Sequence, residues 1–398
     1  MKVLVVHNRY VEPGGEDEVF EAETALLESR GHAVLRYEED NDRIAEMGRL
    51  EVARRTLWSR ESRRSLEDLL LRERPDVAHF HNTFPLVSPA AYWAAAAANV
   101  PVVQTLHNYR LMCANAQLFR DGGPCEECVG RLAPWPGILY GCYRGDRAAS
   151  AVVAGMLGLH RALGTWARRV DRYLTLTRFA RDKMVEGGFP AERIRVKPNF
   201  LPVDPGPGEG RGGYALYVGR LSPEKGIGTL VEAWERLDPP VPLQVVGQGS
   251  EAPAVEALAA RRPEVRMRGR LPRDEVAALM RDALVLVVPS RWYEGFPLVV
   301  VEALAAGLPV IASDLGSLTE VVRPGETGWR VPAGDPAALA AAVARAAADP
   351  TALIPMRRAA REDFKERYTA ERGYTALMEI YREVARNGRV LERTEAVR

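Results

Sequence analysis

The chain contains little lysine, little cysteine and no long apolar run, and each shortage narrows what the protein can be. Lysine occurs five times in 398 residues, so arginine supplies nearly all of the positive charge and a lysine at a motif position becomes informative. No apolar stretch reaches the ~18 residues of a membrane-spanning helix. A dedicated nucleic-acid binder usually has a strongly basic surface, whereas the net charge here is +1. No nucleic-acid partner is therefore expected.

The sequence opens directly on a strand pattern, Met-Lys-Val-Leu-Val-Val, without the features of a signal peptide, and a cytoplasmic location is expected. One apolar stretch, residues 148–159, is followed by Arg161, Arg168, Arg169 and Arg172. A helix of this kind could lie on an anionic bilayer, so the expected location includes peripheral contact with the inner face of the membrane. The alternative is an ordinary amphipathic helix packed on a domain.

Apolar strand patterns alternate with helical patterns along the chain, which is typical of parallel sheets covered on both faces. In the first half, strands are predicted at 2–7, 33–37, 77–81, 102–107 and 172–177, with helices at 16–29, 62–71 and 89–98. In the second half, strands are predicted at 214–219, 243–247, 265–268, 285–289, 310–313 and 329–331, with helices at 226–235, 273–281, 297–306 and 336–348. The alternation predicts an α/β fold.

A stretch rich in proline and glycine, residues 202–213, separates the two series and has the composition of a linker. We therefore predict two doubly wound domains, residues 1–204 and 205–370, with a ligand cleft between them. Residues 371–398 are expected to form a C-terminal helix that could cross back to the first domain.

The stretch 291–302, Arg-Trp-Tyr-Glu-Gly-Phe-Pro-Leu-Val-Val-Val-Glu, places two glutamates around the start of a predicted helix. Pro297 suits the first helical position because it has no N–H to lose there and its φ is already helical. The N–H groups of Leu298 and its neighbour would then favour a phosphate. Glu294 precedes the helix and Glu302 lies about one and a half turns inside it, so each carboxylate could reach a group on one side of the anion. A sugar–diphosphate–nucleoside has that layout.

Two glycine loops add to this pattern. Gly14-Gly15 follows the first strand and opens a helix, so its N–H groups could meet a phosphate or an acceptor oxygen, although turns often use such pairs. The second loop is more specific, because Arg220 and Lys225 lie between a strand and a helix and could neutralise a diphosphate. Gly247-Gln-Gly249 follows another strand and would allow close backbone approach to a nucleoside.

Three histidines fall at predicted strand ends, namely His7, His81 and His107. Ligands of such sheets bind outside the carboxyl ends of the strands, so at least one of these histidines is expected to contact ligand. Asp40-Asn-Asp42 matches a pattern that holds divalent metal in the other large transferase fold, but we interpret it as a solvated loop.

All four cysteines fall within thirty residues of one another, in an insert at about 113–142 that is rich in glycine and proline. Cys125-Glu-Glu-Cys128 forms a knuckle with Cys113 before it and Cys142 after it. That spacing fits a structural four-thiolate zinc site, which would brace a loop just after His107. Reduced, unligated thiols are the alternative, and disulfides are disfavoured in a cytosolic setting.

Together these motifs resemble those of the retaining family 4 glycosyltransferases of the GT-B fold, over nearly the whole chain. The motifs are Gly14-Gly15, Pro75-Asp76-Val-Ala-His-Phe-His81, Thr105-Leu-His107-Asn, Val196-Lys-Pro-Asn199, Gly219-Arg220 with Lys225-Gly226, Gly247-Gln-Gly249 and Glu294-Gly-Phe-Pro-x4-Glu302. The resemblance implies two Rossmann-like domains facing each other, with acceptor bound by the first and nucleotide sugar by the second.

The resemblance also implies roles for individual residues. Arg220 and Lys225 would hold the diphosphate, Glu302 the ribose hydroxyls and Glu294 the transferred sugar. The backbone of three residues would contact sugar and phosphate: Gly295, Phe296 and Leu298. His107 would lie beside the sugar ring. The glycines at 14, 15, 247 and 249 would complete the donor site.

The implied reaction is retaining transfer of a hexose from a nucleotide-diphosphate sugar to a hydroxyl of a glycan or lipid-linked glycan, as in polysaccharide biosynthesis. No metal or other cofactor is expected to be required for catalysis. Other classes share the two-domain architecture: a sugar-nucleotide epimerase, a glycan phosphorylase and a non-catalytic nucleotide-sugar-binding protein. A dehydrogenase is disfavoured, because neither half carries G-x-G-x-x-G followed by an acidic ribose ligand.

Overall fold

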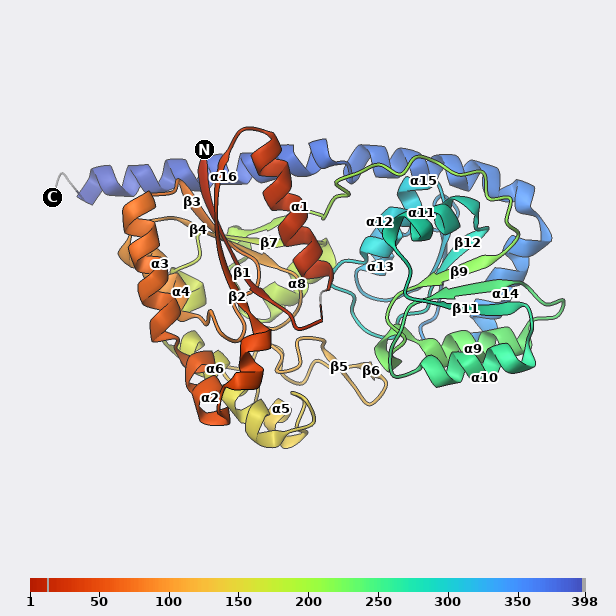
Figure 1. Cartoon of the computed structure of the whole chain (residues 1–398), viewed down its shortest axis with the longest axis horizontal. Helices are drawn as coiled ribbons and strands as arrows, with labels where there is room; N and C mark the ends of the chain where they lie inside the picture. The colour runs from red at the N-terminus through yellow and green to blue at the C-terminus, as the bar shows by residue number, and fades with distance from the viewer. Residues whose placement is uncertain (13, 396–398) are drawn as a thin grey trace. The chain divides into compact units, whose positions relative to one another are not determined.

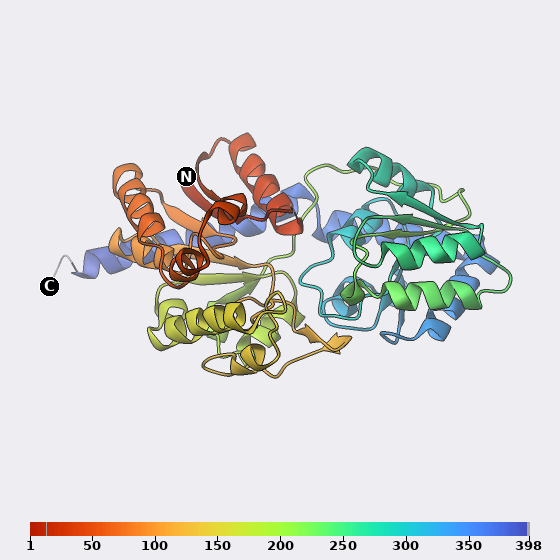
Figure 2. The same ribbon diagram turned by 60° about the horizontal axis from the view of Figure 1, so that its bottom comes forward.

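A computed structural model describes residues 1–12 and 14–395, with side chains described through Arg386. The chain divides into two compact units (Figures 1 and 2). The first unit contains residues 1–117, 126–199 and 373–398, and the second contains 118–125 and 200–372. The predicted boundary at 204/205 therefore lies a few residues beyond the observed division after Asn199.

The first unit is built on a six-stranded parallel sheet with the strand order β2-β1-β3-β4-β7-β8. Its strands are β1 (Lys2–Arg9), β2 (Ala33–Asp40), β3 (Val77–Phe80), β4 (Val102–Leu106), β7 (Arg172–Thr175) and β8 (Ile194–Val196). In β1, Val3 and Leu4 point to opposite faces, and both are fully buried, as expected for a sheet covered on both sides. The strand order reverses between β1 and β3, which is where doubly wound sheets bind ligands.

The first unit contains helices of which several were not predicted from the sequence (Figure 1). They are α1 (Gly15–Ser29), α2 (Arg49–Leu57), α3 (Arg60–Glu73), α4 (Ala90–Ala97), α5 (Trp135–Leu139), α6 (Arg147–Ala162), α7 (Thr165–Arg168) and α8 (Arg178–Glu186), with the 3-10 turns η1 (Asn41–Glu46) and η2 (Ala191–Arg193). Of these helices, α2, α5 and α7 pack against α6 rather than on the sheet. Asp40, the first residue of the Asp-Asn-Asp pattern, is the N-cap of η1, because its carboxylate accepts from the backbone N–H of Asp42 at 2.8 Å. The segment is therefore a 3-10 turn, and Asn41 is buried and accepts from the side-chain amide of Asn8 at 2.9 Å, so the predicted solvated loop is wrong for this residue.

The C-terminal helix α16 (Ala370–Glu395) supplies part of the first unit's core from residue 373 onward. Its buried side chains pack with those of α1 and of four strands in one cluster. That cluster contains Val3, Val5, Phe20, Leu27, Val77, Val103, Leu174, Leu377, Met378, Ile380, Tyr381 and Val384. The last helix is therefore a structural part of the first unit.

The second unit repeats the same plan with the strand order β11-β10-β9-β12-β13-β14. Its strands are β9 (Ala215–Val218), β10 (Leu243–Val246), β11 (Val265–Gly269), β12 (Val285–Val288), β13 (Val310–Ser313) and β14 (Gly328–Val331). Its helices are α9 (Ile227–Arg236), α10 (Ala252–Arg261), α11 (Arg273–Asp282), α12 (Leu298–Ala305), α13 (Leu318–Val321), α14 (Pro336–Ala348) and α15 (Leu353–Arg367), with the turns η3 (Pro223–Lys225) and η4 (Pro350–Ala352). Two apolar clusters fill the space on the two sides of the sheet.

A short antiparallel hairpin, β5 (Phe119–Arg120) with β6 (Gly123–Pro124), lies in the cysteine-rich insert and groups with the second unit. Its position was not predicted, because residues 118–125 carry only a weak strand pattern. Within the described residues, no single helix is long and apolar enough to cross a membrane, although the bent pair α14 and α15 meets that test by length and composition.

Candidate active site

The second unit brings the predicted anion-binding residues together at the carboxyl ends of β9 and β12. These two strands lie side by side where the strand order reverses. The loop after β9 carries Arg220 and Lys225, and the loop after β12 carries Glu294. Residues that are about seventy positions apart in sequence therefore meet at the edge where doubly wound sheets bind ligands.

Lys225 and Glu294 form an ion pair at the centre of this site. The Lys225 ammonium donates to both carboxylate oxygens of Glu294, at 2.8 and 3.0 Å. The hydroxyl of Ser290 donates to the same carboxylate at 2.6 Å, and the Trp292 ring lies 5.2 Å from the ammonium. Two of the three ammonium protons are thus engaged, and the third is left for another acceptor.

The carboxylate of Glu294 is buried, with 4% of the residue exposed. Burial alone would raise its pKa, but the charge of Lys225 and the hydrogen bonds from Lys225 and Ser290 outweigh burial and lower the pKa below the ordinary 4.5. Glu294 is therefore an ionised hydrogen-bond acceptor at neutral pH. Such a group can accept hydrogen bonds from sugar hydroxyls through its remaining lone pairs.

Arg220 is held differently from Lys225. Its side chain is 61% exposed, and its guanidinium contacts the carboxylate of Glu224 at 3.3 Å. Glu224 is fixed in turn by the hydroxyl of Ser222 at 2.7 Å, and its backbone carbonyl accepts from the N–H of Arg291 at 2.8 Å. The structure thus presents one exposed cation and one partly buried cation on the same loop.

Glycines allow the loops of this site to pack against one another. Gly226 has a φ of +74°, and a Cβ there would lie 1.9 Å from the carbonyl oxygen of Pro289 at the end of β12. A Cβ on Gly247 would lie 1.9 Å from the carbonyl oxygen of Gly219, and one on Gly249 would lie 2.3 Å from that of Leu221. These contacts explain the predicted glycines by packing between loops, without a nucleoside.

The helix α12 begins at Leu298, and Pro297 is its N-cap rather than its first residue as predicted. The N–H of Leu298 donates to the carbonyl of Phe296 at 3.0 Å, so this amide does not point outward as the sequence suggested. Gly295 accepts from the hydroxyl of Ser317 at 3.3 Å. Glu302 lies inside the helix and is half-buried, about one turn beyond Leu298 rather than the one and a half turns predicted.

In the first unit, Gly14 and Gly15 open α1 as predicted, with Gly14 as the N-cap; Pro13 lies outside the described residues. The N–H of Gly14 donates to Asp17 at 2.8 Å, so the loop is closed by a side chain of its own helix. Asp17 also contacts Nε2 of His7 at 2.9 Å. Burial would raise the pKa of Asp17, but the hydrogen bonds from His7 and Gly14 lower it overall.

Two of the predicted histidines are in direct contact beyond the ends of β3 and β4. Nδ1 of His81 lies 3.0 Å from Nε2 of His107, and the rings stack with centroids 5.2 Å apart. Burial lowers the pKa of both well below the ordinary 6.5, and the neighbouring histidines lower it further. Both rings are therefore neutral at pH 7. His107 is partly exposed, whereas His81 is fully buried.

All four cysteines are thiols. Cys128 and Cys142 flank Gly137, where a Cβ would lie 4.0 Å from Sγ of Cys128 and 3.9 Å from Cβ of Cys142. Cys113 hydrogen-bonds Oδ1 of Asn115 at 2.9 Å, and Cys125 donates its N–H to the carbonyl of Leu118. Among the described residues, the side chains close enough to share a metal ion are Glu23, His79 and His81, and none of the cysteines is among them, so the zinc site stays a prediction.

Sequence reasoning missed several residues that the structure places at these sites. Ser290 and Trp292 surround the Lys225–Glu294 pair, and Glu23 and Lys197 form a buried ion pair in the first unit. Lys197 belongs to one of the quoted motifs, and the scarcity of lysine was the available signal for it. Glu23 lies mid-helix among other acidic residues, and nothing in its sequence context distinguishes it.

Comparison with known proteins agrees with this geometry. Residues 14–199 match the model of the "Glycosyl transferase 4-like domain", and residues 208–367 match that of "Glycosyl transferases group 1". Glycogen synthase of Mycobacterium tuberculosis is 30% identical over 322 residues, which cover 77% of this chain and 69% of that protein. A phosphatidyl-myo-inositol mannosyltransferase of Mycobacterium leprae is 31% identical over 273 residues, which cover 67% of this chain and 63% of that protein.

Solved structures share the fold over almost the entire chain. Anabaena Alr3699/HepE in complex with UDP superposes with a TM-score of 0.69 at 16% identity, covering 96% of this chain and 100% of that one. Sucrose-phosphate synthase from Thermosynechococcus elongatus superposes with a TM-score of 0.71 at 20% identity, covering 96% and 98%. The predicted GT-B fold is confirmed, and the chain belongs to the family 4 glycosyltransferases, enzymes that transfer a sugar from a nucleotide-sugar donor.

Proposed function

We propose that this glycosyltransferase moves a hexose from a nucleoside-diphosphate sugar to a hydroxyl of a glycan or lipid-linked glycan, with retention of the anomeric configuration. The Lys225–Glu294 pair carries this proposal, because it places an ammonium with one unused proton beside an ionised carboxylate. The ammonium binds the diphosphate and the carboxylate accepts hydrogen bonds from the sugar. Structures of Anabaena Alr3699/HepE with UDP and with UDP-glucose support a donor of this class.

The other residues of the donor site complete these roles. Arg220 is exposed on the same loop as Lys225 and binds a second phosphate oxygen. Glu302 binds the ribose hydroxyls, and the backbone at Gly295 and Phe296 lines the sugar and phosphate, whereas the N–H of Leu298 is engaged by Phe296. His107 contacts the transferred sugar through its partly exposed ring.

In the reaction, the bond between the anomeric carbon and the phosphate oxygen breaks while a bond to the acceptor oxygen forms on the same face of the sugar. The acceptor's proton passes to the departing phosphate oxygen, so atoms and charges balance without a covalent intermediate on the protein. Arg220 and Lys225 stabilise the negative charge that grows on the leaving diphosphate. We propose that this needs no added metal, and full activity in the presence of EDTA is the expected result.

The test is a panel of nucleotide sugars, each assayed for donor hydrolysis and for transfer. An active donor whose transferred sugar keeps its anomeric configuration by NMR would support the proposal. Conversion of the donor without an acceptor would indicate an epimerase, and a strict need for inorganic phosphate would indicate a phosphorylase. Either result would overturn the proposed reaction.

We also propose that the first unit contacts an anionic membrane surface through α5 and α6. Six large apolar side chains in this region are at least 44% exposed: Leu132, Trp135, Leu139, Tyr140, Leu159 and Leu163. Arginines accompany them, and Arg131 stacks on Trp135 at 5.1 Å. Exposed apolar side chains with a positive surround suit the interface of an anionic bilayer. Sedimentation with phosphatidylglycerol vesicles but not with phosphatidylcholine vesicles is expected, and Trp135→Ala should weaken it.

A further inference from the structure

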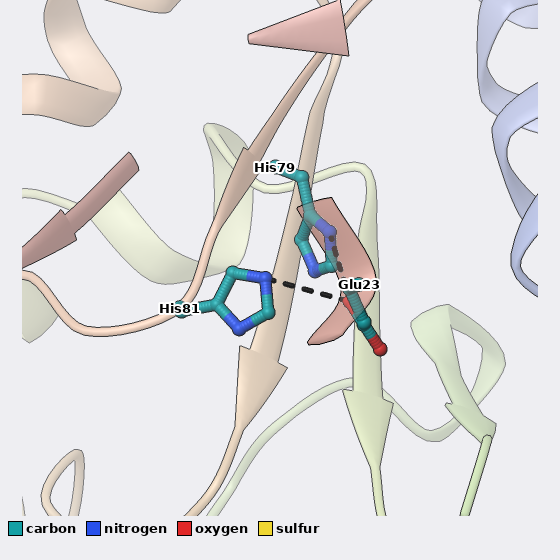
Figure 3. A group of neighbouring side chains, drawn as sticks. All are labelled: Glu23, His79 and His81. Carbon is teal, nitrogen blue, oxygen red and sulfur yellow. Dashed lines mark ion pairs between the residues drawn. The ribbon is translucent and has the colours of Figure 1, made fainter. Parts of the chain in front are cut away.

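Behind His107, the first unit contains a file of buried titratable side chains that the reaction proposed above does not use. It runs from His81 to Glu23, with His79 beside it, as Figure 3 shows. It ends at Lys197, which is paired with Glu23. These four residues are at most 3% exposed. Buried ionisable groups are unfavourable unless they are paired, so a run of them calls for an explanation.

The contacts follow one another along this file. Nε2 of His107 lies 3.0 Å from Nδ1 of His81. On the opposite edge of the same ring, Nε2 of His81 faces Oε2 of Glu23 at 3.5 Å, as Figure 3 shows. The other carboxylate oxygen of Glu23 is bound by the ammonium of Lys197.

The charges of Lys197 and Glu23 determine which ring nitrogens of His81 and His107 carry a proton. The ammonium of Lys197 has no lone pair and can only donate, so it keeps Glu23 in the form that accepts. A carboxylate facing Nε2 of His81 favours a proton on that nitrogen, because two lone pairs facing each other would leave both groups unsatisfied in a buried site. A neutral imidazole carries one N–H, so Nδ1 of His81 is then an acceptor.

The same argument fixes the next ring. Since Nδ1 of His81 accepts, Nε2 of His107 must donate across the 3.0 Å contact. The neutral ring of His107 then has its proton on Nε2, and Nδ1 carries a lone pair. We propose that Glu23 and Lys197 act through His81 as positioning residues that hold His107 in this tautomer, and that Nδ1 of His107 accepts a hydrogen bond from a hydroxyl of the transferred sugar.

A metal ion held by Glu23, His79 and His81 is the competing explanation, because their ligand atoms all lie within 4.8 Å of one another. The contacts disfavour it. Both nitrogens of His79 already have partners, the hydroxyls of Tyr381 and Thr105, each at 2.7 Å. A divalent ion would also lie next to the ammonium of Lys197 with a single carboxylate to balance both charges.

This inference rests on the proposed contact between His107 and the sugar, but its central claim can be tested in the free protein. The chain has six histidines, so selective ¹⁵N labelling of histidine gives few signals, and a His107→Gln sample identifies that of His107. Two-bond ¹⁵N–¹H couplings at pH 7 should show His107 protonated at Nε2. A proton on Nδ1 would overturn the proposal, whatever the kinetics, and no variant is needed for that result.

The variant that tests the source of the tautomer is Glu23→Gln. The amide oxygen must face Lys197, which cannot accept, so the amide NH₂ faces His81 and donates to Nε2. His81 then carries its proton on Nδ1 and donates to His107, which inverts the tautomer of His107. Tyr381→Phe is the matched control, because it removes a buried hydrogen bond to His79 and leaves the file from His107 to Lys197 intact.

Kinetics separate this inference from the proposed function. Glu23→Gln should lower kcat/KM for transfer by about tenfold, the effect of one lost hydrogen bond, and leave the affinity for the nucleoside diphosphate unchanged. An unchanged tautomer in Glu23→Gln, or an inverted one in Tyr381→Phe, would overturn the positioning role. An inverted tautomer with unchanged kcat/KM would leave that role intact and overturn the contact between His107 and the sugar. Stoichiometric shifts of the His79 and His81 signals on adding zinc would favour the metal site and overturn the inference.

Discussion

Replacing Lys225 with methionine tests whether the ion pair with Glu294 organises the donor site. Methionine keeps the length and apolar character of the lysine side chain but leaves the carboxylate of Glu294 buried without its cation. Breaking a buried pair in this way costs about 3–5 kcal/mol of unfolding free energy. The side chain of Lys225 is 23% exposed, so solvent partly screens the pair and we expect about 2–3 kcal/mol at pH 7. For a unit of this size the melting temperature should fall by roughly 4–12 °C.

The loss should depend on pH in a defined direction. In the wild type the folded pKa of Glu294 is lowered, so the stability that its ionised form contributes is present above 4.5 and lost as pH falls through the folded pKa. Without Lys225, burial dominates and the folded pKa rises above 4.5. Protonated Glu294 is then the form that favours folding, and stability falls as pH rises through the raised pKa. The difference between wild type and Lys225→Met should therefore grow with pH.

Calorimetric unfolding between pH 4 and pH 8 measures this difference. The control is the double variant Lys225→Met with Glu294→Gln, which removes the unpaired charge and should recover at least half of the lost stability. A constant difference between wild type and Lys225→Met across the whole range would refute the assignment of Lys225 as the cation that ionises Glu294. An equally unstable double variant would show that lost packing, not charge, explains the loss.

Arg220→Ala should lower kcat/KM by about ten- to a hundredfold, because it removes one charge-assisted hydrogen bond to phosphate. The melting temperature should stay the same, because the side chain is 61% exposed. A normal kcat/KM would show that Arg220 does not bind the donor. Gly226→Ala should destabilise the protein by more than ~2 kcal/mol in denaturant unfolding, because its Cβ would meet the carbonyl of Pro289. Gly228→Ala, on the open face of α9, should instead stabilise the protein by about 0.5–1 kcal/mol in the same measurement. Elemental analysis of protein prepared without chelator should find one zinc ion per chain, and the single variants Cys125→Ser and Cys128→Ser should each lose it. Wild-type protein without zinc would refute the zinc site.

Much of the fold could be predicted because parallel strands that are buried on both faces leave plain apolar runs in the sequence. The predicted strand at 310–313 and the predicted helix at 336–348 match β13 and α14 residue for residue. Short elements were not predicted, because they leave no such apolar run or repeat in the sequence. The strand β8 has three residues, and α13 has four, so neither contains enough of a repeat to be recognised.

For the candidate site, the sequence identified the residue types but not their partners. It predicted that Lys225 and Glu294 would serve the same ligand, and the structure adds that they bind each other. It placed His7, His81 and His107 at strand ends of one sheet edge; His81 and His107 are in contact there, whereas His7 lies inside β1, fully buried and bonded to Asp17. Glu23 could not be predicted, because its contacts with Lys197 and the histidines join segments far apart in sequence that only tertiary packing brings together.

The return of α16 to the first unit limits how this protein can be divided. A fragment ending after the last strand of the first sheet would lack Leu377, Tyr381 and Val384, and would expose Phe20 and Leu27, against which they pack. Burying one such side chain contributes about 1.5–3 kcal/mol, so the loss of three is comparable with the margin of about 5–15 kcal/mol by which an ordinary domain remains folded. An engineered version of the first unit alone would therefore need the terminal helix grafted back, through a new linker, to remain folded.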